Sequence, residues 1–105
     1  MPITHSVSVD GAPIRLTAER WEHICWRHPD MRGQQERVLE TVRSASELLE
    51  GDFGATLAAR FYRRTPLTSK YLVVAYKKVG PMDGFVMTAY FARRLPAWRR
   101  RLWKQ

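Results

Sequence analysis

The sequence is poor in cysteine and in long apolar runs. Its one cysteine, Cys25, has no second cysteine to pair with in the chain, and we expect a reducing compartment, the cytoplasm. No apolar run approaches the roughly 18 residues that indicate a membrane-spanning helix, so we expect no membrane partner. The opening segment MPITHSVSVD lacks the basic start and apolar stretch of a signal peptide, so we expect none.

Acidic side chains are also few. Ten Asp and Glu stand against 18 Lys and Arg, which gives a formal net charge of +8. A basic protein of this kind favours a polyanionic partner, and nucleic acid is the commonest. An acidic partner protein, or a soluble protein that is merely basic, fits the charge as well. With 105 residues, 45% of them apolar, the chain can bury one core.

The first half of the chain predicts two short extended pieces, ITHSVSV and IRL, followed by two helices. Thr17 is a good N-cap, and Pro29 disfavours helical geometry at the residue before it, so the first helix should end near His28. Asp30 is expected to cap a second helix, which apolar residues at a helical period continue to Ala45. Residues 44–50 are expected to end it in an extended segment.

The pattern changes after Gly54. Three runs rich in β-branched and aromatic residues follow, TLAARFYRR, KYLVVAYKKV and GFVMTAYFARR, and short polar connections between them predict an antiparallel meander. We therefore expect an α+β domain over residues 1–95, with two N-terminal helices packed on a four-stranded antiparallel sheet. Residues 96–105 are expected to form a basic, aromatic tail, with residues 97–104 in a short helix or extended arm anchored by Trp98 and Leu102.

The spacing His23, Cys25, His28 raises the question of a metal site. On a helix His23 and Cys25 would lie about 200° apart and would not converge on one ion. Cys25 also falls on the apolar stripe with Trp21 and Ile24, where a free cysteine behaves as a small hydrophobe. We therefore expect no metal and no cofactor.

An acid/base pair is the second interpretation of the two histidines. Histidine can donate or accept a proton near neutral pH, although a histidine at a helix edge is often only structural or solvated. Polar residues on the predicted strands would complete a cationic, hydrogen-bonding site, although Thr and Tyr are also simply favoured in strands. These residues are Arg60 and Tyr62, then Lys77 and Lys78, then Thr88 and Tyr90.

The segments RWEHICWRHPD, RFYRR, KYLVVAYKK and GFVMTAYF, in this order, resemble the ribonuclease-toxin superfamily that unites barnase, EndoU, ribonuclease colicins and RelE. The resemblance covers residues 14–92 and is to the phage- and toxin-associated branch. It implies two helices on a four-stranded antiparallel sheet and RNA cleavage without a metal. It assigns catalytic roles to His23, His28, Thr88 and Tyr90, and less directly to Lys77 and Arg60. The chain departs from barnase, whose general base is a glutamate, because no glutamate here has a convincing position.

The implied reaction uses the RNA 2′-hydroxyl as nucleophile, and its products are a 2′,3′-cyclic phosphate and a 5′-hydroxyl. The expected partners are RNA and an acidic antitoxin or immunity protein. A non-catalytic nucleic-acid-binding module and a protein-interaction module remain open, since both would use the same basic surface. The residues expected to contact nucleic acid are Tyr62, Arg63, Lys78, Arg93, Arg99, Arg100 and Arg101.

Overall fold

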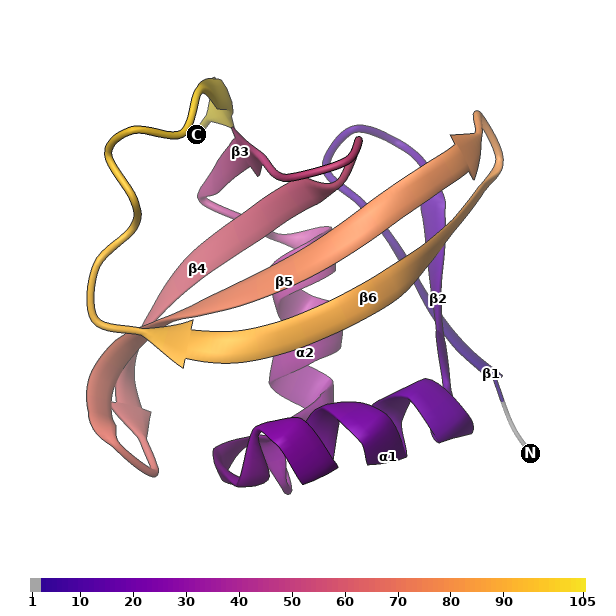
Figure 1. Cartoon of the computed structure of the whole chain (residues 1–105). Coiled ribbons are helices and arrows are strands. Elements are labelled where there is room, and N and C mark those ends of the chain that lie inside the picture. Colours follow the sequence, from indigo (N-terminus) through magenta and orange to yellow (C-terminus); the bar gives the residue numbers. More distant parts are fainter. Residues whose placement is uncertain (1–2) are drawn as a thin grey trace.

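Seven strands form one sheet in the order β1-β2-β6-β5-β4-β3-β7 in the computed structural model, which describes residues 3–105 (Figure 1). The strands are β1 (Ile3–Val7), β2 (Pro13–Thr17), β3 (Glu47–Glu50), β4 (Thr56–Thr65), β5 (Thr68–Gly80), β6 (Asp83–Ala92) and β7 (Arg101–Lys104). The helices are α1 (Ala18–Arg27), the short 3₁₀ helix η1 (Pro29–Met31) and α2 (Gln35–Arg43).

The expected four-stranded antiparallel sheet under two N-terminal helices is wrong. The sheet has seven strands and is mixed, because β2 runs parallel to β6. The two N-terminal extended pieces form an antiparallel hairpin that joins the sheet. The segments ELLE and RLWK add β3 and β7 at the other edge. A local alternation of apolar and polar residues indicates a strand but does not indicate its partner, and four-residue strands carry little periodic signal.

The meander of β4, β5 and β6 is confirmed, and β5 lies at its centre. The two faces of β5 contribute to two apolar clusters, so the strand is buried on both sides. Leu72, Val74 and Tyr76 point to the back face, where they pack in the core with both helices. Val73 and Ala75 point to the front face, which is turned toward the viewer in Figure 1.

The first helix follows the prediction closely. The Thr17 hydroxyl accepts a hydrogen bond from the Arg20 amide at 3.0 Å, and His28 is the C-terminal cap. The second helix begins later than expected, at Gln35, and Asp30 lies in η1 instead of capping it. Gly33 has a φ of 80°, a left-handed conformation that separates η1 from α2. Within residues 3–105, neither helix is long and apolar enough to span a membrane.

The segment predicted as a tail ends in a strand of the sheet. β7 pairs antiparallel with β3, with Trp103 opposite Leu48, so the alternative of an extended arm is the correct one. The expected anchoring contact between Trp98 and Leu102 is wrong, since these residues are 75% and 44% exposed. Backbone hydrogen bonds to β3 hold the segment in place of that contact.

Candidate active site

The end of β2 places α1 next to β6. β2 reaches β6 at a single ladder position, Arg15 opposite Phe85, and the chain turns into α1 directly after Thr17. Position 84 of β6 is crowded from both neighbouring strands: a Cβ on Gly84 would lie 2.6 Å from the Ile14 Cδ1 atom of β2 and 2.9 Å from the Lys77 carbonyl oxygen of β5. Beyond this point α1 contacts β6, and it runs below β6 in Figure 1.

A β-bulge in β6 shapes the strand beside this helix. Ala75 of β5 lies opposite Thr88, but Tyr76 lies opposite Val86, so Met87 is an extra residue. Val86 faces the back core, whereas the consecutive residues Met87 and Thr88 both line the hollow beside α1. Bulges commonly redirect a side chain in this way, and here the bulge lets Thr88 point toward α1.

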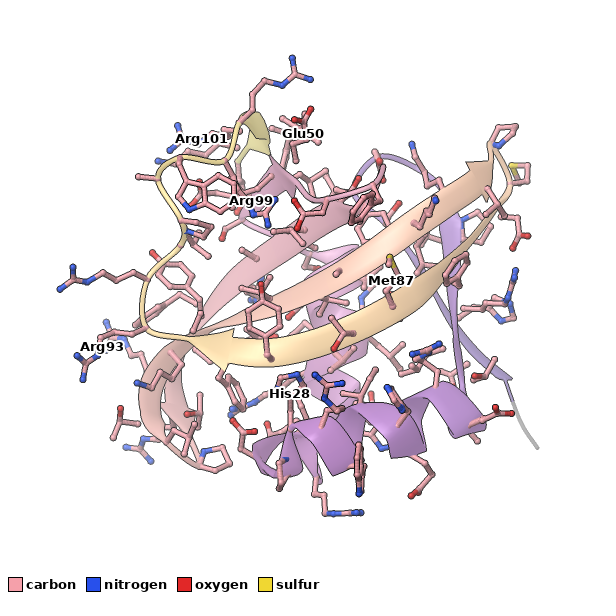
Figure 2. The ribbon with its side chains drawn as sticks, in the orientation of Figure 1. His28, Glu50, Met87, Arg93, Arg99 and Arg101 are labelled. Carbon is pink, nitrogen blue, oxygen red and sulfur yellow. The ribbon has the colours of Figure 1, made fainter. Side chains whose placement is uncertain are left out.

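The facing surfaces of α1 and β6 enclose a groove of about 450 Å³, which we call the histidine groove. It contains all four of the residues that the resemblance singles out most directly, although their catalytic role stays a prediction. Figure 2 shows His28 between α1 and β6, and Met87 in front of the sheet. The lining residues are Arg20, His23, Arg27 and His28 from α1 and its cap, and Met87, Thr88 and Tyr90 from β6.

The two histidines differ in setting. His28 leaves the helical conformation, with φ −130° and ψ 82°, and its ring centroid lies 5.9 Å from that of Tyr90. It is half-buried between the helix and the strand. His23 is exposed, and its ring centroid lies 6.4 Å from that of Trp26. The groove therefore holds one sheltered and one solvent-facing imidazole.

The Tyr90 hydroxyl is protonated at neutral pH. Burial raises the pKa of this phenol above its usual value of 10.0, the Arg99 guanidinium opposes the shift, and the Asp52 carboxylate adds to it. A neutral phenol can donate a hydrogen bond to a phosphate oxygen. Tyr90 is thus suited to donate to an anion in the groove.

Two arginines of the groove were missed in the sequence reasoning. Arg20, His23 and Arg27 follow one another at i, i+3 and i+7, which places them on one face of α1. This spacing is visible in the sequence and could have indicated both arginines. Neither guanidinium has a carboxylate partner in the part of the chain that the structure describes, so both charges face the groove uncompensated. Glu19 shares a neighbouring hollow of about 420 Å³ with His23.

Arg60 and Tyr62 are not brought to the groove. Both contact α2 on the back face of the sheet. Arg60 donates a hydrogen bond to the Ser44 carbonyl oxygen at 2.8 Å, and the Tyr62 hydroxyl donates to Glu40 Oε1 at 2.6 Å. Burial, followed by this hydrogen bond, raises the pKa of Tyr62. The sheet separates both side chains from the histidines, so neither can touch a phosphate held there.

The two lysines at the end of β5 also lie outside the groove lining. Lys77 shares the front face with Ala75, two residues earlier on β5. Its side chain lies next to Gly54, since a Cβ added to that glycine would be 3.7 Å from the Lys77 Cε atom. Lys78 is paired with Asp10, with 2.9 Å between Nζ and Oδ2. Lys77 is thus on the same face as Thr88 but next to the β3–β4 turn.

The arginines of the C-terminal segment form ion pairs with residues of and around β3. Arg99 binds both carboxylate oxygens of Asp52, at 3.1 and 3.2 Å. Arg100 and Arg101 pair with Glu50 and Glu47, at 3.3 and 3.0 Å. These ion pairs lie beside the backbone pairing of β7 with β3, a setting that the sequence reasoning did not assign to them. Of the other residues expected to bind nucleic acid, Arg63 and Arg93 are exposed.

The three potential metal ligands around α1 diverge. Cys25 is 2% exposed and lies in the back core, and burial raises the pKa of its thiol. His23 lies on the exposed side of the same helix. Across residues 3–105, no three His, Cys, Asp or Glu side chains gather into a set that would hold an ion.

Comparison of the chain with protein-family models, with curated proteins and with solved structures gives no match. The resemblance to the ribonuclease-toxin superfamily therefore stays a prediction carried by the quoted segments.

Proposed function

We propose that the protein is a metal-independent endoribonuclease that acts in the histidine groove. The observation that carries the proposal is the meeting of His23, His28, Thr88 and Tyr90 in one hollow with two uncompensated guanidiniums. Two imidazoles can supply both proton transfers of phosphodiester cleavage, and each such group contributes about 10²–10⁴-fold in rate. The cationic side chains supply charge where the reacting phosphate becomes more negative.

In the proposed reaction one histidine removes the proton from the RNA 2′-hydroxyl. The oxygen attacks the adjacent phosphorus, and the bond from phosphorus to the 5′-oxygen breaks. The second histidine protonates that leaving oxygen, which yields a 2′,3′-cyclic phosphate and a 5′-hydroxyl. Arg20, Arg27 and the hydroxyls of Thr88 and Tyr90 would donate to the non-bridging phosphate oxygens during attack.

The setting proposed for this activity is the cytoplasm, with the protein acting as a toxin on cellular RNA. A toxin of this kind needs restraint in the cell that makes it. The net charge of +8 supports an acidic antitoxin or immunity protein as the restraining partner. Such a partner would cover the groove and its two unpaired arginines.

The test is incubation of the purified protein with RNA in excess EDTA, followed by mapping of the cut ends. We expect cleavage to persist in EDTA and to leave a cyclic phosphate on the upstream fragment. A DNA strand of the same sequence should remain intact, because it lacks the 2′-hydroxyl. Cleavage that EDTA abolishes, or fragments that carry a 5′-phosphate, would contradict the proposal.

A further inference from the structure

A second cleft lies on the front face of the sheet, beneath the segment that joins β6 to β7. Its volume is about 680 Å³, and Tyr71, Arg93, Arg94, Leu95 and Arg99 are among its lining residues. Figure 2 shows Arg93 at the end of β6 and Arg99 in front of the sheet. Tyr71 and Leu95 of this cleft and Tyr90 of the histidine groove pack against the same apolar cluster of the front face, so the cleft and the groove lie beside each other.

Aromatic side chains extend across this face on three neighbouring strands. Phe61 of β4 lies opposite Tyr71 of β5, and Tyr71 lies opposite Ala92 of β6, two residues beyond Tyr90. The rings of Phe61 and Tyr71 meet edge to face, with centroids 5.2 Å apart and planes at 73°. Phe61 is 48% exposed, and its ring offers a surface on which a planar base can stack.

Some of the arginines around the cleft form ion pairs with carboxylates, and others do not. Arg99 and Arg101 are paired with Asp52 and Glu47. Arg93 and Arg94 are exposed and have no carboxylate partner among the residues that the structure describes. Two adjacent uncompensated guanidiniums beside an aromatic surface match the backbone and the bases of a nucleic-acid strand.

We propose that the front face binds single-stranded RNA, with bases stacked on Phe61 and Tyr71 and phosphates held by Arg93 and Arg94. The RNA strand would continue past Tyr90 into the histidine groove. This inference therefore rests on the proposed ribonuclease function and specifies that its substrate is single-stranded. A duplex would not fit this role, because its bases are stacked inside and present no face to the aromatic rings. The arginines Arg99 and Arg101 shape the cleft through their ion pairs and are not assigned to phosphates.

The test measures binding separately from cleavage. A fluorescently labelled 2′-O-methyl RNA strand has no free 2′-hydroxyl, so the wild-type protein can bind it without cutting it. Anisotropy titrations at several salt concentrations give its affinity and salt slope for the wild type, R93A/R94A, Phe61→Ala, Phe61→Tyr and R43A/R64A. The last variant is the matched control, since Arg43 and Arg64 are exposed and lie with α2 and the end of β4.

We expect R93A/R94A to weaken binding about tenfold or more and to reduce the salt slope by roughly 1.4, the value for two phosphates on a single strand. Phe61→Ala should weaken binding at least about fivefold, and Phe61→Tyr, which keeps the ring, should not. R43A/R64A should stay within about twofold of the wild type. An equal loss in the control, or a duplex bound as tightly as the single strand, would overturn the inference.

Two further outcomes separate this inference from the proposed function. The wild type could fail to cut natural RNA and still bind the modified strand, with the losses expected for R93A/R94A and Phe61→Ala. In that case the ribonuclease proposal fails and the binding surface stands. If the wild type cuts RNA while R93A/R94A and Phe61→Ala bind unchanged, the binding surface fails alone. If polyglutamate displaces the strand fully, and its own binding is weakened by R93A/R94A but not by Phe61→Ala while binding of the strand is also insensitive to Phe61→Ala, the face would be assigned to an acidic protein and the inference overturned.

Discussion

The ring centroid of His28, at the end of α1, lies 5.9 Å from that of Tyr90, near the end of β6. This contact joins the helix to the sheet at the place where the groove is formed. It holds an imidazole beside a phenol whose burial keeps its proton in place. The contact thereby fixes the His28 imidazole, which can transfer a proton, relative to the Tyr90 hydroxyl, which can donate a hydrogen bond.

The first prediction concerns the two groove histidines. We expect His23→Ala and His28→Ala each to reduce the rate of RNA cleavage by at least about 10²-fold, because each removes one proton-transfer group. The far-UV circular dichroism spectrum of both variants should remain that of the wild type. Initial rates on a labelled RNA strand measure the effect.

His5→Ala is the matched control for this experiment. His5 is exposed on β1 and does not line the groove, so its variant should cleave at the wild-type rate. Full activity in both groove variants would remove the histidines from the mechanism.

The second prediction separates the Tyr90 hydroxyl from its ring. Tyr90→Phe keeps the contact with His28 and removes only the donor, so cleavage should fall roughly tenfold or more while RNA affinity changes little. Tyr76→Phe makes the same chemical change at a buried tyrosine whose hydroxyl donates to Asp10 Oδ1 at 2.9 Å. That variant should lose about 1 kcal/mol of stability and keep its activity. Equal activity in wild type and Tyr90→Phe would show that the hydroxyl takes no part.

Local features of the chain were predictable because they depend on neighbouring residues alone. The Thr17 hydroxyl caps the helix that follows it, and Pro29 ends that helix. The spacing of Thr88 and Tyr90 along one strand, together with the two helix histidines, predicted residues that do meet in one groove.

Features that depend on distant residues were not predictable. Nothing near Arg15 indicates that β2 runs parallel to β6, since that pairing depends on where α1 must pack. The bulge at Met87 leaves no mark in the sequence either. The sequence predicted a short helix or extended arm anchored by Trp98 and Leu102 at residues 97–104, and nothing near this segment indicates that Glu47, Glu50 and Asp52 lie beside it.

The third prediction concerns stability in acid. Burial alone would raise the pKa of Asp10, but hydrogen bonds from Ser8, Lys78 and Tyr76 outweigh it and lower the pKa below 3.8. A carboxyl with a depressed pKa in the folded state stabilises the fold above its unfolded pKa. This stabilisation is lost as the pH falls from about 4 through the folded value.

Thermal melts between pH 7 and pH 2.5 test the assignment. Asp10→Asn should have a lower Tm than the wild type at pH 7, and the difference should shrink as the pH falls below about 4. Asp30→Asn is the control, because within residues 3–105 its carboxylate forms no hydrogen bond or ion pair. A Tm difference between Asp10→Asn and wild type that stays constant over the whole range would exclude Asp10 as the titrating group.

The last prediction concerns the C-terminal strand. Deleting residues 97–105 removes β7 and leaves β3, which carries Leu48 and Leu49, as an unpaired edge strand. We expect a lower Tm and self-association, because an unprotected apolar strand edge pairs with other chains. Circular dichroism melts and sedimentation velocity measure the two effects. Arg100→Ala is the control: its ion pair with Glu50 is exposed, so the Tm should shift by less than about 4 °C. A truncated protein that stays monomeric with the wild-type Tm would mean that β7 contributes nothing to the sheet.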